Sequence, residues 1–321
     1  MSAAPTRVRE DPGVQPERAD PGPVVVAVVG PTASGKSDLG VALALALGGE
    51  VVNADSMQLY RGMDVGTAKL SAAERRGVPH HLLDVWDVTE TASVADYQRR
   101  ARAVVDGLRR SGRTPLLVGG SGLYVRAVLD HLEFPGTDAA VRARLEAELA
   151  EVGAAEMHRR LAEADPEAAA AILPGNGRRI VRALEVVEIT GGRFTATLPA
   201  EREFYPSVRI GLDVPRPVLD ARIDARVERM WAAGLVQEVR RLADAGLREG
   251  ITASRALGYA QLLRMLDGDL TEEQALEETQ RATRRFARRQ DTWFRRDDRV
   301  VWLPYDADDL LERALALIRR H

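Results

Sequence analysis

The feature that most constrains the fold is residues 30–37, Gly-Pro-Thr-Ala-Ser-Gly-Lys-Ser, which fit the P-loop pattern without departure. Residues 24–29 before it are apolar and mostly β-branched, as in a buried strand, and residues 39–47 after it are rich in Ala and Leu, as in a helix. A glycine-rich turn between strand and helix directs backbone N–H groups at one point, where an anion binds. A chance match is the competing interpretation, and these flanks argue against it.

This loop predicts a site for a di- or triphosphate. Lys36 adds a mobile positive charge, and the hydroxyl of Ser37 suits a Mg²⁺ ion. The residues expected to bind the phosphates are Gly30, Thr32, Ala33, Ser34, Gly35, Lys36 and Ser37. The loop alone does not indicate what happens to the bound phosphate.

The order of elements predicts an α/β fold with a P-loop NTPase-like parallel sheet, because apolar strands alternate with helical stretches. Strands are expected at 24–29, 50–54, 82–85, 115–118, 208–214 and 300–303. Helices are expected at 39–47, 92–110, 178–190, 218–233, 236–245, 259–266 and 271–296.

The composition changes near residue 138, where Ala, Glu and Arg dominate up to residue 171 with apolar residues at helical spacing. We therefore expect a mostly helical insertion domain at 135–207. The core would consist of 23–134 and 208–321, and residues 1–22 would form a disordered tail.

The composition also excludes several classes of protein. The chain has no cysteine, which excludes disulfides, thiolate zinc sites and cysteine nucleophiles. No apolar run approaches the roughly 18 residues that span a bilayer, and the N-terminus lacks the apolar core of a signal peptide. We expect a soluble, cytoplasmic protein. The net charge of −3 argues weakly against nucleic acid as a partner, but eight arginines crowd into residues 281–299 and favour phosphate binding there.

Asp55 follows the second predicted strand and is expected at the same edge of the sheet as the P-loop, since ligands bind outside the carboxyl ends of parallel strands. Its carboxylate could hold Mg²⁺ or accept a proton from a substrate, and a capping role in a turn is equally compatible with its position. The strand at 115–118 ends in glycines followed by Ser121. The absence of a Walker-B aspartate there weakens an ordinary NTPase or kinase assignment.

Other polar residues are less specific. Thr67, Lys69 and the pair His80-His81 are expected to be polar loop residues rather than ligands. Arg222 and Arg226 lie one helical turn apart, and one such arginine could reach a diphosphate, although solvated surface is the commoner role. Trp293 and Phe294 among arginines suit RNA, but their spacing slightly favours an amphipathic helix with its aromatic residues in the core.

Seven ordered blocks of the chain resemble bacterial tRNA dimethylallyltransferases, the isopentenyl transferases that modify adenosine beside the anticodon. The blocks are residues 30–37, 53–69 (NADSMQLYRGMDVGTAK), 79–84 (PHHLLD), 118–124 (VGGSGLY), 178–185, 257–259 and 288–295 (RRQDTWFR). They span nearly the whole chain beyond the N-terminal tail. One departure is Arg288, where relatives commonly have lysine, and both residues are cations.

The resemblance implies transfer of a dimethylallyl group from its diphosphate to N6 of adenosine 37, in tRNAs that read codons starting with U. It implies that Asp55 is the general base, that Arg226 reaches the diphosphate, and that Ser121 stands where many relatives have threonine. The P-loop would then hold a diphosphate leaving group, with Mg²⁺ at Ser37. We expect a monomer that binds the anticodon stem-loop and no membrane.

The resemblance also assigns contacts with tRNA. They fall on Asp55, Ser56, Met57, Gln58, Ser121, Arg142, Arg178, Arg179, Arg182, Arg255, Gly258, Tyr259, Arg288, Arg289, Gln290, Trp293 and Arg295.

Two other functions remain open from the residues alone. A P-loop small-molecule kinase would consume ATP and need no RNA. A nucleotide-regulated RNA-binding module would bind RNA without forming a product.

Overall fold

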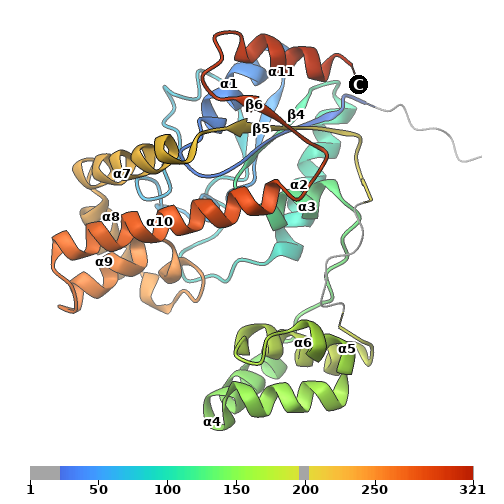
Figure 1. Cartoon of the computed structure of the whole chain (residues 1–321), viewed down its shortest axis with the longest axis vertical. Coiled ribbons are helices and arrows are strands. Elements are labelled where there is room, and N and C mark those ends of the chain that lie inside the picture. Colours follow the sequence, from blue (N-terminus) through green and yellow to red (C-terminus); the bar gives the residue numbers. More distant parts are fainter. Residues whose placement is uncertain (1–21, 195–201, 321) are drawn as a thin grey trace, which may run out of the picture.

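The computed structural model describes residues 22–194 and 202–320. Its centre is a six-stranded, all-parallel sheet in the order β3-β2-β4-β1-β5-β6 (Figure 1). The strands are β1 (Val25–Val29), β2 (Glu50–Asn53), β3 (His80–His81), β4 (Pro115–Gly119), β5 (Ser207–Asp213) and β6 (Val300–Pro304). The predicted α/β class with a parallel sheet is confirmed.

Burial on both faces explains why the central strands are continuously apolar. Every residue of β1 and β4 is buried, and β1 lies between β4 and β5. Parallel strands need long crossover connections, which here are mostly helices that cover the sheet. One face packs on α1 (Lys36–Leu47) and α11 (Leu310–Ile318).

The other face carries the larger core. Its helices are α2 (Val94–Arg110), α3 (Gly122–Leu129), α8 (Leu235–Asp244), α9 (Tyr259–Leu266) and α10 (Glu272–Phe294). The helix α7 (Arg216–Ala232) lies along α10 (Figure 1). Two short 3₁₀ turns, Leu247–Glu249 and Ala253–Arg255, join α8 to α9.

Three helices gather apart from the sheet (Figure 1). They are α4 (Ala139–Ala164), α5 (Pro166–Ala171) and α6 (Gly177–Thr190), and they enclose a hydrophobic cluster of their own. Within α4, Gly153 has a φ of 80° and kinks the helix. These helices fall inside the segment 135–207 that we predict to be an insertion, although the exact limits of that domain stay a prediction.

One predicted strand is wrong. Residues 82–85 are a turn, since Leu82 and Asp84 have φ angles of 61° and 57°, a left-handed conformation that no strand adopts. The strand in this region, β3, ends just before them. The helices α3 and α11 were not predicted. The tail 1–22, apart from Gly22, lies outside the described residues.

No helix among the described residues is both long and apolar enough to cross a membrane.

Candidate functional site

The P-loop adopts the turn that its glycines permit. Gly30 and Gly35 have φ angles of 135° and 99°, conformations that side chains disfavour, and α1 begins at Lys36 directly after them. The ammonium of Lys36 donates to the carbonyl of Pro31 at 3.1 Å. The first turn of α1 therefore directs unpaired N–H groups and a lysine at one point, as an anion site requires.

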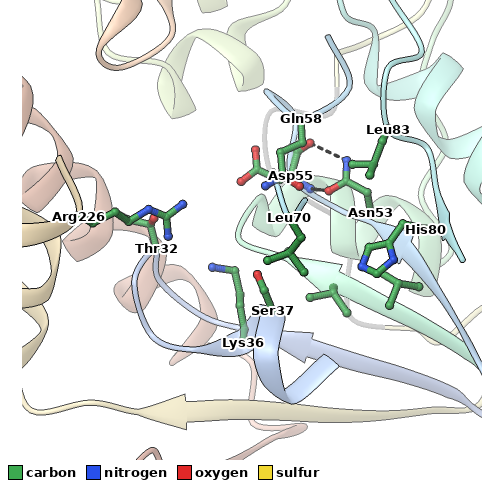
Figure 2. Close-up of a pocket in the computed structure, with 13 residues that line it drawn as sticks. Thr32, Lys36, Ser37, Asn53, Asp55, Gln58, Leu70, His80, Leu83 and Arg226 are labelled. Carbon is green, nitrogen blue, oxygen red and sulfur yellow. Dashed lines mark hydrogen bonds between the residues drawn. The ribbon is translucent and has the colours of Figure 1, made fainter. Parts of the chain in front are cut away.

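A cavity lies over the carboxyl ends of β1, β2 and β4, next to this loop. Its lining comes from the P-loop, from strand ends, from the segment after β2 and from α7. The lining residues are Thr32, Lys36, Ser37, Val51, Asn53, Asp55, Gln58, Leu70, His80, Leu83, Val118, Gly119 and Arg226. Figure 2 shows Arg226 and Lys36 turned toward the carboxylate of Asp55, with Leu70, His80 and Leu83 on the other side.

The cavity is electrostatically prepared for an anion. Burial and the charge of Arg226 lower the pKa of Lys36 to about 8, and Asp55 opposes this effect. Burial also lowers the pKa of Arg226, again opposed by Asp55. Two cations held together out of water repel each other, and a diphosphate would relieve that repulsion.

Asp55 is held with part of its carboxylate free. Its backbone N–H donates to the side chain of Asn53 at 2.9 Å, and its Oδ1 accepts the N–H of Met57 at 3.0 Å. Asn53 is fixed in turn, because its amide donates to the carbonyls of Asp55 and Leu82, each at 3.0 Å. Among the described residues, none donates to Oδ2 of Asp55. A turn thus orients the carboxylate and leaves one oxygen for the cavity.

Ser121 connects the end of β4 to the Asp55 segment. Its hydroxyl accepts the N–H of Ser56 at 3.1 Å and donates to the hydroxyl of Ser56 at 3.3 Å. Ser121 precedes α3 but does not cap it with its side chain. The structure therefore gives Ser121 a role in fixing the residue next to Asp55.

Gln290 connects α10 to the phosphate loop. Its Oε1 accepts the N–H of Thr32 at 3.0 Å, and its Nε2 donates to the carbonyl of Gly120 at 2.9 Å. Its side chain is buried, and a Cβ at Gly120 would lie only 2.3 Å from it. Such a residue offers little surface to RNA, and the structure shows it as a bridge between the P-loop and β4; its contact with tRNA stays a prediction.

Two other residues predicted to contact tRNA are also inside the protein. Tyr259 is fully buried and its hydroxyl donates to Glu238 at 2.6 Å, while Gly258 is buried with a φ of 85°. A direct contact between RNA and the side chain of Tyr259 does not fit this burial. Sequence spacing alone could not reveal this burial, because the contacts of Tyr259 with Glu238 and Gly66 lie far apart in the sequence.

The predicted arginines divide by environment. Arg142 and Arg182 both pair with the buried carboxylate of Glu185, and Arg182 also donates to the carbonyls of Pro135 and Gly136. These contacts connect α6 to the start of α4 and to the segment before it. Exposed side chains belong to Arg178, Arg179, Arg255, Arg288, Arg289 and Arg295. Of these, Arg295 pairs with Asp213 and Asp291 and stacks over Trp302 at 4.2 Å.

On α10, Phe294 is buried in the core whereas Trp293 is 37% exposed. Trp293 joins Arg288, Arg289, Thr292 and Arg296 around a shallow surface pocket. Its ring lies against Gly122, where a Cβ would stand 2.1 Å from it. Because Gly122 follows Ser121, this basic and aromatic surface adjoins the segment that carries Asp55.

Sequence reasoning missed several cavity residues. The prediction that His80 and His81 are loop residues is wrong, because they form β3, and His80 lines the cavity with Leu70 and Leu83. Thr67 and Lys69 remain loop residues: the ammonium of Lys69 donates to the Tyr60 carbonyl, Asp64 and Asp84. Glu238 gave no signal in the sequence.

Comparisons with known proteins point to one family. A family model described as IPP transferase matches residues 58–297. The tRNA dimethylallyltransferase of Thermobifida fusca is 72% identical over 302 residues, which cover 92% of this chain and 95% of the relative. That of Streptomyces griseus is 68% identical and covers 93% and 96%.

Solved structures are similar as well. The tRNA isopentenylpyrophosphate transferase of Bacillus halodurans has a TM-score of 0.69 at 42% identity, covering 92% of this chain and 97% of that one. A eukaryotic dimethylallyltransferase described as acting on tRNA has a TM-score of 0.76 at 24% identity and supports the fold alone.

Proposed function

This chain belongs to the IPP transferase family, the tRNA dimethylallyltransferases, and we propose that it transfers a dimethylallyl group from dimethylallyl diphosphate to N6 of adenosine 37. The acceptors would be tRNAs that read codons starting with U. The observation that carries this proposal is one cavity in which the cations Lys36 and Arg226 face the open oxygen of Asp55.

The cations stabilise the leaving group. As the allylic C–O bond breaks, negative charge grows on the departing diphosphate, and the P-loop N–H groups, Lys36 and Arg226 are already oriented toward it. The allylic carbon then bonds to the N6 nitrogen, and diphosphate remains in the loop.

Asp55 accepts the proton that this nitrogen loses. The exocyclic amine of adenine is a poor nucleophile, because its lone pair is delocalised into the ring. A carboxylate that accepts its N–H hydrogen bond and then the proton assists the attack. The turn from Asn53 to Met57 holds the carboxylate in place, and the hydroxyl of Ser121 holds the next residue.

The donor set is compatible with Mg²⁺ at Ser37. Its hydroxyl lines the cavity beside Lys36, and the open oxygen of Asp55 belongs to the same space. Among the described residues no three acidic or histidine side chains gather into a metal site, so diphosphate oxygens and water would supply most ligands. A bound Mg²⁺ would neutralise part of the diphosphate charge.

The RNA would approach over α10. Arg288, Arg289 and Trp293 are exposed next to the turn that bears Ser121, and they suit phosphates and an unstacked base. The adenine must leave its stack to reach the cavity, which costs a few kcal/mol. We propose that the protein acts as a monomer.

Transfer can be tested with an anticodon stem-loop bearing A36-A37-A38, dimethylallyl diphosphate and Mg²⁺. Mass spectrometry should find one dimethylallyl group on A37, and no ATP should be consumed. Unmodified RNA would refute the proposal. ATP-dependent phosphorylation would favour a kinase, and RNA binding without product would favour a binding module.

A further inference from the structure

A buried carboxylate that the reaction does not use lies behind the cavity. Glu238, on the inner side of α8, is 4% exposed. Its Oε2 accepts the N–H groups of Asp64 at 3.1 Å and Val65 at 2.8 Å. Its Oε1 accepts the N–H of Gly66 at 3.1 Å and the hydroxyl of Tyr259 at 2.6 Å. Three consecutive backbone N–H groups and one phenol thus surround a single carboxylate.

These contacts lock the loop 64–67 against α8 and α9. The ring of Tyr259 packs directly on Gly66, where a Cβ would stand 2.6 Å from it. Burial and the carboxylate of Glu238 raise the pKa of Tyr259, which keeps its hydroxyl a donor at any physiological pH. A buried carboxylate is costly unless its oxygens accept hydrogen bonds, and here four donors fill them.

The locked loop presents its next carbonyl to two residues of the cavity. The carbonyl of Thr67 accepts a hydrogen bond from Nη2 of Arg226 at 3.4 Å and another from the side-chain amide of Gln58 at 3.1 Å. Both side chains line the cavity. The position of the Thr67 carbonyl therefore influences where the guanidinium of Arg226 lies, and Glu238 holds the three residues just before it.

We propose that Glu238, with Tyr259, is a positioning residue for Arg226: it fixes the loop whose Thr67 carbonyl orients the guanidinium toward the diphosphate. This inference rests on the proposed function only in that Arg226 binds the diphosphate. It assigns a role to Tyr259 that agrees with its burial, and one to Glu238 that no motif suggested.

The test measures the affinity for inorganic diphosphate by calorimetry in Glu238→Gln, in Arg226→Ala and in the double variant. An amide replaces one acceptor oxygen with a donor that faces N–H groups, so E238Q should weaken diphosphate binding about tenfold. If Glu238 acts through Arg226, E238Q should cause no further loss in the R226A background. Asp244→Asn, an exposed carboxylate of the same helix, is the matched control and should bind as the wild type does.

Additive losses in the double variant would overturn the inference, as would unchanged binding in either single variant. Tyr259→Phe removes only the hydroxyl and provides a second test if E238Q does not fold. It should weaken diphosphate binding severalfold and raise KM for dimethylallyl diphosphate while KM for the stem-loop stays constant. Equal affinity for diphosphate in Y259F and wild type would contradict the shared role.

Failure of the proposed function is distinguishable from failure of this inference. A wild-type protein that binds diphosphate but does not alkylate RNA would refute the function. The diphosphate affinities of E238Q, R226A and the double variant would still decide the role of Glu238.

Discussion

At the scale of single residues, the site depends on how a few side chains are held as well as on which are present. Asp55 follows β2 as its place in the sequence predicts, but only the structure shows the Asn53 and Met57 hydrogen bonds that orient it. Such bonds need backbone geometry that a residue pattern does not specify. The role of a general base can be tested at this scale.

Replacement of Asp55 by Asn should lower turnover by about 100-fold or more, because an amide cannot accept the proton from N6. Affinity for the stem-loop should change little, since the amide keeps the size and most hydrogen bonds. Single-turnover kinetics and filter binding measure the two quantities. Wild-type turnover in D55N would remove Asp55 from the base role.

The lowered pKa of Lys36 predicts how diphosphate binding depends on pH. Bound diphosphate raises the pKa of Lys36 again, so binding above pH 8 or so requires the uptake of a proton. The affinity contributed by Lys36 should therefore be full below about pH 8 and fall by up to tenfold per pH unit above it.

Calorimetry with inorganic diphosphate between about pH 7 and about pH 9.5 measures this fall. Lys36→Met is the control, because it retains any pH dependence of the ligand itself. The same decline in K36M and in the wild type would show that protonation of Lys36 does not cause the pH dependence of diphosphate binding.

At the scale of elements, most strands were predictable from the sequence, whereas the segment after β3 and the short helix α3 were not. Continuous apolar runs located β1, β2, β4, β5 and β6 to within a residue or two of their ends. The strand at 82–85 failed because a left-handed backbone at Leu82 and Asp84 leaves no mark in the apolar pattern. The helix α3 was missed because it is short and starts among glycines.

Long-range contacts were the least predictable part of the site. Gln290 meets Thr32 across 258 positions of sequence, and Glu238 meets Val65 across 173. Local periodicity could not predict either contact, because each depends on how α8 or α10 packs on the core. The helix α10 therefore has an inner side that supports the P-loop and an outer side that carries exposed arginines.

Replacement of both Arg288 and Arg289 by Ala should weaken binding of the stem-loop and flatten its dependence on salt, because fewer counterions are released from the RNA. The slope of log affinity against log salt should fall by about 1 to 2. Arg319 and Arg320, exposed after α11, are the matched control pair, because α11 packs on the other face of the sheet. An unaltered slope in the Arg288 and Arg289 variant would place these side chains outside the interface.

At the scale of the whole molecule, a buried ionic cluster stands where the three-helix unit leaves the core. Arg209 of β5 donates to Asp130 at 2.7 Å and to Asp297 at 2.6 Å, and Arg299 donates to Asp130 at 2.9 Å. The backbone of Asp130 also forms an isolated antiparallel β-bridge with Glu203 on the returning segment. The cluster joins the end of α3, β5 and the α10–β6 turn at a single point.

Replacement of Asp130 by Asn should cost about 3 kcal/mol of unfolding free energy, because it leaves Arg209 buried with one charge partner fewer. Burial alone would raise the pKa of Asp130, but Arg299 and Arg209 hold it below its usual value. Its contribution to stability is therefore present above about pH 4 and is lost as the pH falls through the lowered value. Denaturant unfolding at neutral and acid pH measures it.

The variant Asp308→Asn, at an exposed site before α11, should leave stability unchanged. Equal unfolding free energies for D130N and D308N at neutral pH would contradict a stabilising role for the cluster.

The central claim is that the P-loop holds a departing diphosphate while carbon, not phosphorus, is transferred. The direct measurement uses dimethylallyl diphosphate labelled with ¹⁴C in the allyl group and ³²P in the diphosphate, incubated with protein, Mg²⁺ and the stem-loop. We predict ¹⁴C in RNA and an equal molar amount of ³²P as free diphosphate. Phosphorus label in RNA, or diphosphate release without labelled RNA, would contradict the account.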